Sequence, residues 1–95
     1  MINIEHVEGR DKGPVMLYAL STCVWCKKTK KLLNDLGVKY DYIFVDLLEP
    51  DDKKEVEKRV EEWNPRCSFP TLVLNNQRCI IGYQEKDIKE ALGDA

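Results

Sequence analysis

A pair of cysteines between a strand pattern and a helix pattern constrains the fold of this chain more than any other feature. Residues 14–20, PVMLYAL, form a near-continuous apolar run with β-branched and aromatic members, which predicts a strand buried on both faces. Cys23 and Cys26 follow in the segment STCVWC, and from Val24 onward the apolar residues recur at helical spacing. The chain is therefore expected to pass from a buried strand into a helix with Cys23 at the junction.

The rest of the chain alternates between strand and helix patterns. Thr29, Leu32, Leu33 and Leu36 mark the buried face of the first helix, and Gly37 is expected to cap it. The later elements are predicted as a strand at 40–46, a helix at 51–63 ended by Pro65, strands at 70–74 and 77–81 joined by a tight turn at Asn75-Asn76, and a helix at 85–92. This order predicts an α/β fold in which a four-stranded mixed sheet lies between helices on both faces. Residues 1–13 are expected to form an extra strand or an extended arm.

Length and composition favour a small cytoplasmic domain. The chain has 95 residues, of which 43% are hydrophobic and 34% are charged, a balance typical of one soluble globular domain. A net charge of −2 gives no reason to expect binding to nucleic acid or to an anionic membrane. No apolar segment is long enough to span a bilayer or to act as the core of a signal peptide. In the reducing cytoplasm, a CxxC pair points to redox chemistry or metal binding rather than to a permanent disulfide.

The position of the two cysteines predicts different roles for them. Cys23 should lie at a helix N-terminus, where free amides and the helix dipole favour a thiolate, and Lys27 and Lys28 follow closely. Cys26 lies one turn further on, in register with Thr29, and should face the interior. We therefore expect Cys23 to attack a target disulfide and Cys26 to resolve the mixed disulfide that results.

Metal binding and a purely structural role are the alternatives for this pair. Cys67 and Cys79 form no second CxxC motif, and the single histidine, His6, belongs to the N-terminal segment, so no metal site is predicted. We expect Cys79 to be a small core residue, and we expect Trp63, at the end of the apolar stripe of the second helix, to lie in the core. Cys67 is expected to be exposed near the site, where an additional redox role is the less favoured interpretation.

Three segments together resemble the glutaredoxin family of the thioredoxin-like fold. They are MLYALSTCVWCKKTKKLL, NPRCSFPTLVL and CIIGYQEKDIKEAL, and the resemblance covers residues 14–92. It implies a glutaredoxin-like domain over residues 14–95 that acts as a monomeric thiol–disulfide oxidoreductase on protein disulfides, with no bound cofactor. Electrons would come from a thioredoxin reductase or from glutathione.

The resemblance also implies a substrate groove beside the cysteines. The family carries a cis-proline at the position of Pro70, and the backbone of the preceding residue, here Phe69, pairs with the substrate. Trp25 is expected on the surface as a hydrophobic contact for protein substrates. Tyr83 is either a wall of the groove or a packing residue at the start of the last helix. The predicted substrate-binding residues are Trp25, Phe69, Pro70, Thr71, Gly82 and Tyr83.

Three positions depart from the pattern of glutathione-dependent glutaredoxins. Val24-Trp25 replaces the usual proline and aromatic residue, Leu20 replaces a lysine available to the glutathione carboxylate, and Gly82-Tyr83 replaces two glycines. The valine and the Gly-aromatic step look more like the NrdH-redoxins, which a thioredoxin reductase reduces, although those usually have glutamine where this chain has Trp25. Related small redoxins of anaerobes and archaea fit about as well. A glutathione-dependent glutaredoxin and a carrier of a [2Fe–2S] cluster are the rival functions.

Overall fold

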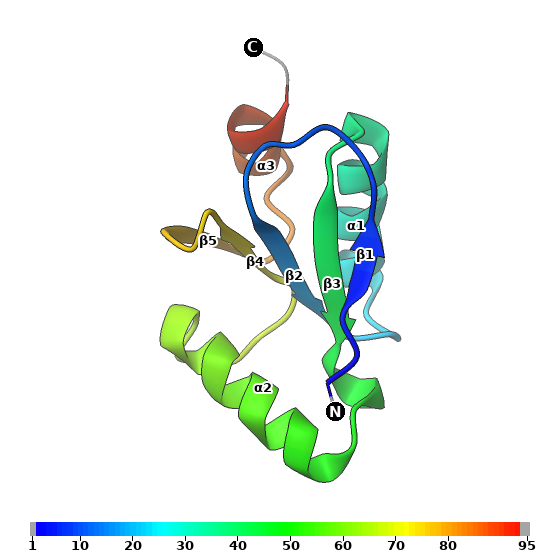
Figure 1. Ribbon diagram of the computed structural model, residues 1–95. Coiled ribbons are helices and arrows are strands. Elements are labelled where there is room, and N and C mark those ends of the chain that lie inside the picture. Colours follow the sequence, from blue (N-terminus) through cyan, green and yellow to red (C-terminus); the bar gives the residue numbers. More distant parts are fainter. Residues whose placement is uncertain (1, 94–95) are drawn as a thin grey trace.

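The computed structural model, described here over residues 2–93, contains a five-stranded mixed sheet with helices on both faces (Figure 1). The strands are β1 (Glu5–Val7), β2 (Val15–Ala19), β3 (Tyr40–Phe44), β4 (Thr71–Leu74) and β5 (Arg78–Ile81). The helices are α1 (Val24–Leu36), the 3-10 helix η1 (Val45–Leu47), α2 (Pro50–Trp63) and α3 (Glu85–Leu92). In space the strands follow the order β1-β3-β2-β4-β5, so β2, which leads to the cysteines, is the central strand.

The pairing of the strands confirms the predicted topology. β2 and β3 run parallel, with Ala19 opposite Phe44, and α1 connects them. β4 pairs antiparallel with both β2 and β5. The N-terminal segment supplies the extra strand that was one of the two expectations for it, because β1 pairs antiparallel with β3 at the sheet edge.

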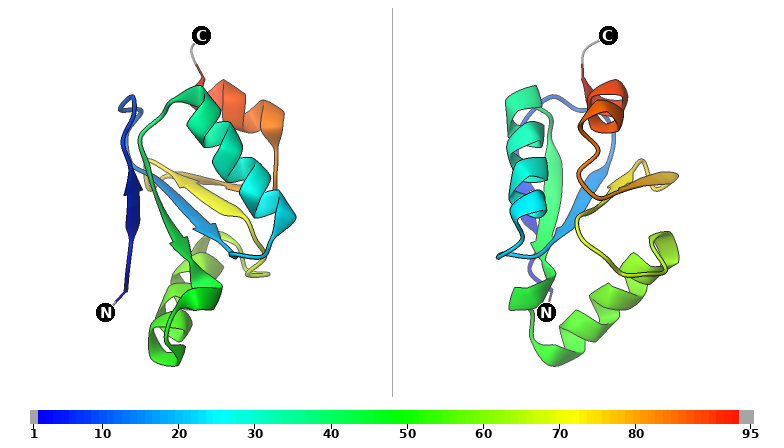
Figure 2. Two further views of the ribbon diagram at one scale, coloured as in Figure 1. Left: turned by 90° about the vertical axis from the view of Figure 1, so that its right-hand side faces the viewer. Right: turned by 180° about the vertical axis from the view of Figure 1, so that it is seen from behind.

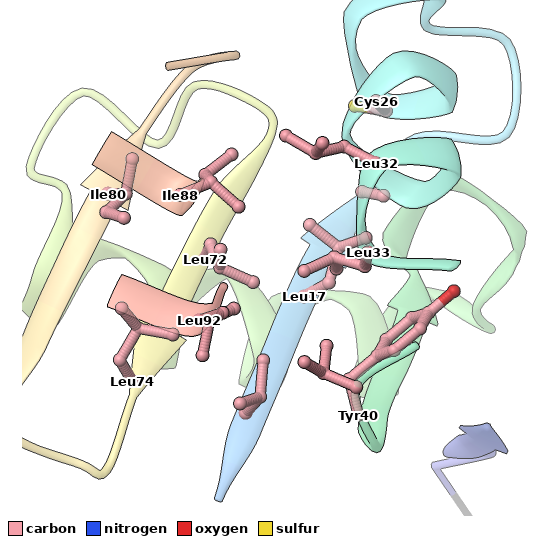
Figure 3. Packing of buried hydrophobic residues seen from close by; sticks show 13 residues of the cluster. Leu17, Cys26, Leu32, Leu33, Tyr40, Leu72, Leu74, Ile80, Ile88 and Leu92 are labelled. Atoms are coloured by element: carbon pink, nitrogen blue, oxygen red, sulfur yellow. The ribbon is translucent and has the colours of Figure 1, made fainter. Parts of the chain in front are cut away.

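Each face of the sheet is covered by its own hydrophobic cluster. α1 and α3 pack on one face and α2 packs on the other (Figure 2). On the first face, Leu17 and Leu72 of the sheet lie against Leu33 of α1 and Ile88 of α3, all essentially without solvent exposure (Figure 3). Phe69, just before β4, contacts both clusters. The end of the sheet next to Cys23 is thus packed against hydrophobic side chains on both faces.

Local chemistry explains where several elements end. Gly37 adopts a left-handed conformation with φ of 68° and caps α1 by donating its amide to the carbonyl of Asn34 at 3.0 Å, as expected. Asn75 and Asn76 have φ of 55° and 53°, which confirms the predicted tight turn.

Several expected boundaries and two expected burials differ from the structure. The strand predicted at 40–46 ends at Phe44, because the chain turns into η1, and α2 begins at Pro50, a residue suited to the first turn of a helix. Trp63, expected in the core, is only half-buried because it is the last residue of α2 and lies near the edge strand β5. The thiol of Cys79 in β5 donates to the Trp63 carbonyl at 3.3 Å, and Cys79 is likewise half-buried rather than fully buried.

The His6 side chain in β1 contacts two carboxylates, one of them on the neighbouring strand β3. These contacts predict a pH-dependent contribution to stability. Its Nδ1 lies 2.6 Å from Asp41 on β3 and its Nε2 lies 2.7 Å from Glu8. The hydrogen bond with Asp41 and then that with Glu8 raise the pKa of His6 above 6.5. A histidine with a raised pKa stabilises the fold fully below the unfolded-state value and loses that contribution as pH rises through the folded-state value.

We therefore expect His6→Ala to lower the free energy of unfolding slightly at pH 5 and to have less effect at pH 9. Urea unfolding of both proteins across this range measures the difference. A difference that stayed constant or grew with pH would contradict this account of the contact.

Candidate active site

The turn after β2 places Cys23 at the start of α1, as predicted. The amide of Cys23 donates to the carbonyl of Leu20 at 3.3 Å, which closes the turn. Cys23 has extended backbone angles and is the N-cap of α1, and its Sγ accepts the Cys26 amide at 3.2 Å. This amide is one of the first in the helix and lacks an acceptor within it. The half-exposed sulfur of Cys23 therefore lies at the positive end of the helix dipole.

Cys26 faces the interior, as its helical register predicted. It is 2% exposed, and its Sγ accepts the amide of Leu20 at 3.4 Å. Burial, and then the hydrogen bond with Cys23, raise the pKa of Cys26 to about 12. Cys26 is therefore a protonated thiol at neutral pH, close to the sulfur of Cys23.

Two lysines of α1 lie over aromatic rings. The ammonium group of Lys28 lies over the ring of Trp25, 4.7 Å from its centroid. The ammonium group of Lys30 lies over the ring of Tyr42 at the same distance. Stacking on an aromatic face stabilises a lysine that would otherwise extend into solvent, which explains these orientations.

A groove of about 240 Å³ contains five of the six predicted substrate-binding residues. Its lining residues are Trp25, Phe69, Pro70, Gly82 and Tyr83. The Phe69–Pro70 peptide bond is cis, as predicted. Trp25 is 56% exposed, as expected, and its ring stacks on that of Tyr83 with the ring centroids 6.0 Å apart. Tyr83 also donates its hydroxyl to Glu85 at 3.1 Å, so it both forms a wall of the groove and packs at the start of α3.

Thr71, the sixth predicted residue, supports the groove from behind instead of lining it. Its side chain is fully buried, and its hydroxyl donates to the carbonyl of Ser68 at 2.8 Å. The same hydroxyl accepts a hydrogen bond from Asn64 at 3.1 Å. A threonine at the first position of a buried central strand satisfies its hydroxyl internally, which is why this side chain is unavailable to a substrate.

Asn64 is a supporting residue that the sequence analysis missed. It is 2% exposed, and its Nδ2 donates to the carbonyl and hydroxyl oxygens of Ser68 and to Thr71. Its Oδ1 accepts the amide of Arg66 at 3.2 Å. An asparagine directly after the helix pattern and before Pro65 was the available signal, because short amide side chains commonly hydrogen-bond to the backbone at such positions.

We expect Asn64→Ala to destabilise the fold by about 1–3 kcal/mol, because it removes four hydrogen bonds through which a buried side chain holds the segment before Pro70. Urea unfolding measures this loss. Gln77→Ala, in the exposed hairpin turn, is the matched control and should have little effect. Equal stability of the two variants would show that the Asn64 contacts contribute nothing to the fold.

Asp46 is a second residue that the sequence analysis did not single out. Its carboxylate accepts the amide of Ser21 at 2.8 Å and the hydroxyl of Ser21 at 2.5 Å. Partial burial opposes ionisation of this carboxyl, but the two hydrogen bonds from Ser21 hold the pKa of Asp46 below its ordinary value. Asp46 is therefore a carboxylate at neutral pH, attached to the turn that carries Cys23.

Cys67 does not belong to the groove. It is half-buried and packs against the hydrophobic cluster on the α2 face, and its Sγ lies 3.9 Å from the carbonyl oxygen of Glu57. Burial, and then the charges of Glu57 and Glu61, raise the pKa of the Cys67 thiol. The expectation of an exposed cysteine near the site was wrong, because residues 64–67 fold back against α2 through the Cys67 amide, which donates to the Asn64 carbonyl.

Over the described residues 2–93, no group of three or more His, Cys, Asp or Glu side chains is arranged to hold a metal ion. Within the same range, no helix combines the length and apolar character needed to cross a membrane.

The fold and the cysteine pair define a class of protein. A CxxC motif at the N-terminus of the first helix, on a mixed sheet with helices on both faces, is the arrangement of thioredoxin-like small redoxins. The glutaredoxin family model matches residues 15–80. The chain therefore belongs to the glutaredoxin family, whose members are thiol–disulfide oxidoreductases.

Solved structures of archaeal proteins are similar to this chain. Methanoredoxin of Methanosarcina acetivorans is 57% identical, with a TM-score of 0.88 and 90% of each chain covered. The glutaredoxin of Methanosarcina mazei Go1 is 53% identical, with a TM-score of 0.88, over 96% of this chain and 88% of that one. Among sequence relatives, glutaredoxin-C6 of rice is 30% identical over 65 residues, or 68% of this chain. The match spans only 56% of the rice protein's length.

Proposed function

We propose that the protein reduces disulfide bonds in other proteins through Cys23 and Cys26. The observation that carries this proposal is the asymmetry of the pair, because the sulfur of Cys23 is accessible at a helix N-terminus while Cys26 is buried and protonated beside it. An exposed thiolate supported by a helix N-terminus is a nucleophile, and a neighbouring shielded thiol is suited to an intramolecular second step.

The reaction transfers two electrons to the target. The Cys23 thiolate attacks one sulfur of the target disulfide, and the other target sulfur leaves with the electron pair and takes up a proton. Cys26 then loses its proton and its sulfur attacks Cys23, which breaks the mixed disulfide and releases the second target thiol. The protein is left with a Cys23–Cys26 disulfide, which a reductant must reduce before the next turnover.

The surface around Cys23 favours a protein segment as substrate. Trp25 and Tyr83 form an aromatic wall on one side, and the neighbouring side chain of Val24 is 62% exposed. Leu47, 69% exposed, follows Asp46 and thus lies close in the chain to the contact with Ser21. Large exposed apolar side chains concentrated near a reactive group are typical of an interaction surface, and a polypeptide offers apolar side chains to cover them.

We further propose that glutathione is a poor reductant for this protein and that a thioredoxin-reductase type of enzyme supplies the electrons. Leu20 stands where the family has a cation for the glutathione carboxylate, and it packs against the cluster on the α2 face. Tyr83 occupies the groove where a second glycine would leave space. Both features weaken a site for an anionic tripeptide.

The proposal also covers the oligomeric state, the compartment and the domain boundaries. We take the protein to act as a monomer in the cytoplasm, with residues 1–13 adding an edge strand to a domain of residues 14–95. Thiols are kept reduced in the cytoplasm, which suits a protein that must return to its dithiol form after each turnover.

Insulin reduction with three sources of electrons tests the proposal. The oxidised protein is supplied with dithiothreitol, with NADPH and a thioredoxin reductase, or with NADPH, glutathione and glutathione reductase. We expect catalysis with dithiothreitol and with thioredoxin reductase, and little with glutathione. Failure to accelerate insulin reduction with any of the three would contradict the disulfide reductase function itself. Equal rates with the two enzymatic systems would contradict only the proposed reductant.

A further inference from the structure

Asp46 holds the turn that carries Cys23, although it belongs to η1, which follows the neighbouring strand β3. β2 and β3 run parallel with Ala19 opposite Phe44, so the segments that follow the two strands leave the sheet at the same end. Ser21 and Asp46 are the residues that meet there. Both carboxylate oxygens are used, one by the Ser21 amide and one by the Ser21 hydroxyl. The reaction described above assigns no part to this contact.

The contact with Asp46 reaches Cys26 through adjacent residues of the backbone. The amide of Ser21 donates to Asp46, and the preceding amide, that of Leu20, donates to the Sγ of Cys26 at 3.4 Å. The carbonyl of Leu20 in turn accepts the amide of Cys23. A displacement of Ser21 would therefore move both the hydrogen-bond donor of Cys26 and the support of Cys23.

Asp46 also acts on Cys26 through its charge. Burial makes the largest contribution to the raised pKa of Cys26, and the negatively charged groups that add to it are Cys23 and Asp46. Once Cys23 is bound in a mixed disulfide it carries no charge, so Asp46 is the anion that remains. The charge of Lys53 in α2 helps to lower the pKa of Asp46 and partly offsets the charge of that carboxylate.

We propose that Asp46 is a positioning residue for the second step of the reaction. Its two hydrogen bonds hold the turn from Leu20 to Cys23 in place, and its negative charge makes the loss of the proton from Cys26 less favourable. This inference rests on the proposed dithiol function. In the step, the sulfur of Cys26 bonds to that of Cys23, and the target sulfur departs with the electron pair of the broken bond. The Cys26 proton passes to solvent, and Asp46 neither bonds to a sulfur nor takes the proton.

Two substitutions separate the two effects. Asp46→Asn keeps an oxygen for the Ser21 amide and offers an amide donor to the Ser21 hydroxyl, but it removes the charge. Asp46→Ala removes the charge and both hydrogen bonds. Asp35→Asn, at the far end of α1 from the cysteines, is the matched control. All proteins carry Cys67→Ser and Cys79→Ser, so that only the active-site thiols react.

Stopped-flow reaction with dithiobis(nitrobenzoate) resolves the two steps. Attack by Cys23 releases one coloured thiolate, and attack by Cys26 releases the second in a step independent of protein concentration. Between pH 6 and 9, we expect Asp46→Asn to speed the second release by about two- to tenfold, because the fraction of Cys26 thiolate rises while the geometry persists. Asp46→Ala should be several-fold slower than Asp46→Asn in this step, and the control should match the parent protein.

Two results would overturn the inference. If Asp46→Asn released the second thiolate at the parent rate, the charge would be without effect on Cys26. If the alanine and asparagine variants behaved alike, the hydrogen bonds would be without effect. Should Asp46→Ala fail to fold by circular dichroism, Ser21→Ala replaces it, since it removes one hydrogen bond and keeps the charge, and it should be slower than the parent protein. Absence of the second release in the parent protein would instead contradict the dithiol mechanism.

Discussion

Replacing Cys26 with serine is expected to arrest the reaction at a mixed disulfide between Cys23 and the target protein. Cys23 remains accessible at the helix N-terminus, so the first attack proceeds, but no neighbouring thiol can release the product. Replacing Cys23 with serine should abolish both the reaction and the trapped complex, with turnover of insulin falling by about 100-fold or more. The buried and protonated Cys26 cannot substitute as the first nucleophile.

Non-reducing electrophoresis with mass spectrometry of the trapped complex, together with insulin turnover, measures these effects. Cys67→Ser and Cys79→Ser are matched controls, since both thiols lie on the α2 side of the sheet and should be dispensable. If Cys26→Ser reduced insulin at the rate of the natural sequence without added thiol, the two-thiol mechanism would be wrong. Trapping of a target by Cys23→Ser would reverse the proposed roles of the two cysteines.

The second large effect concerns glutathione. We expect slow turnover in a glutathione-coupled assay with a small mixed-disulfide substrate, and we expect Leu20→Lys combined with Tyr83→Gly to raise it by about tenfold to a hundredfold. The lysine would restore a charge-assisted hydrogen bond to the tripeptide carboxylate, which contributes about 1.5–3 kcal/mol. The glycine would remove the aromatic ring that stacks on Trp25 and forms a wall of the groove.

Single variants and a displaced charge control this experiment. Leu20→Lys and Tyr83→Gly alone show whether charge or space limits the use of glutathione. Gln77→Lys adds a lysine in the exposed turn between β4 and β5, outside the groove, and should leave turnover unchanged. Efficient turnover of the natural sequence at millimolar glutathione, unimproved by the double substitution, would identify an ordinary glutathione-dependent glutaredoxin.

Local patterns in the sequence predicted the elements that position the cysteines. The short apolar run before Ser21, with its β-branched and aromatic residues, and the helical spacing after Val24 place Cys23 at a strand-to-helix junction. The same spacing turns Cys26 inward. The turn at Asn75-Asn76 was predictable for a similar reason, since asparagine tolerates the positive φ that such a turn requires.

The supporting contacts of Thr71 and Asp46 were not predicted from the sequence. Thr71 was expected in the groove, but its hydroxyl turns inward to Asn64 and Ser68. Asp46 was predicted as the last residue of a strand, whereas the chain turns there and its carboxylate reaches Ser21 in the turn after β2. A polar residue next to a strand pattern has many partners within reach, and the sequence does not say which one the fold supplies.

The stacking of Trp25 on Tyr83 gives the protein a built-in optical reporter. The chain has two tryptophans, and only Trp25 lies between the cysteines, with Lys28 over its ring, whereas Trp63 ends α2 on the opposite face of the sheet. Tryptophan emission is sensitive to a nearby thiolate or disulfide and to contact with another ring. In a Trp63→Phe background, the emission of Trp25 alone would follow oxidation, reduction and the arrival of a target in real time, with no label attached to the protein.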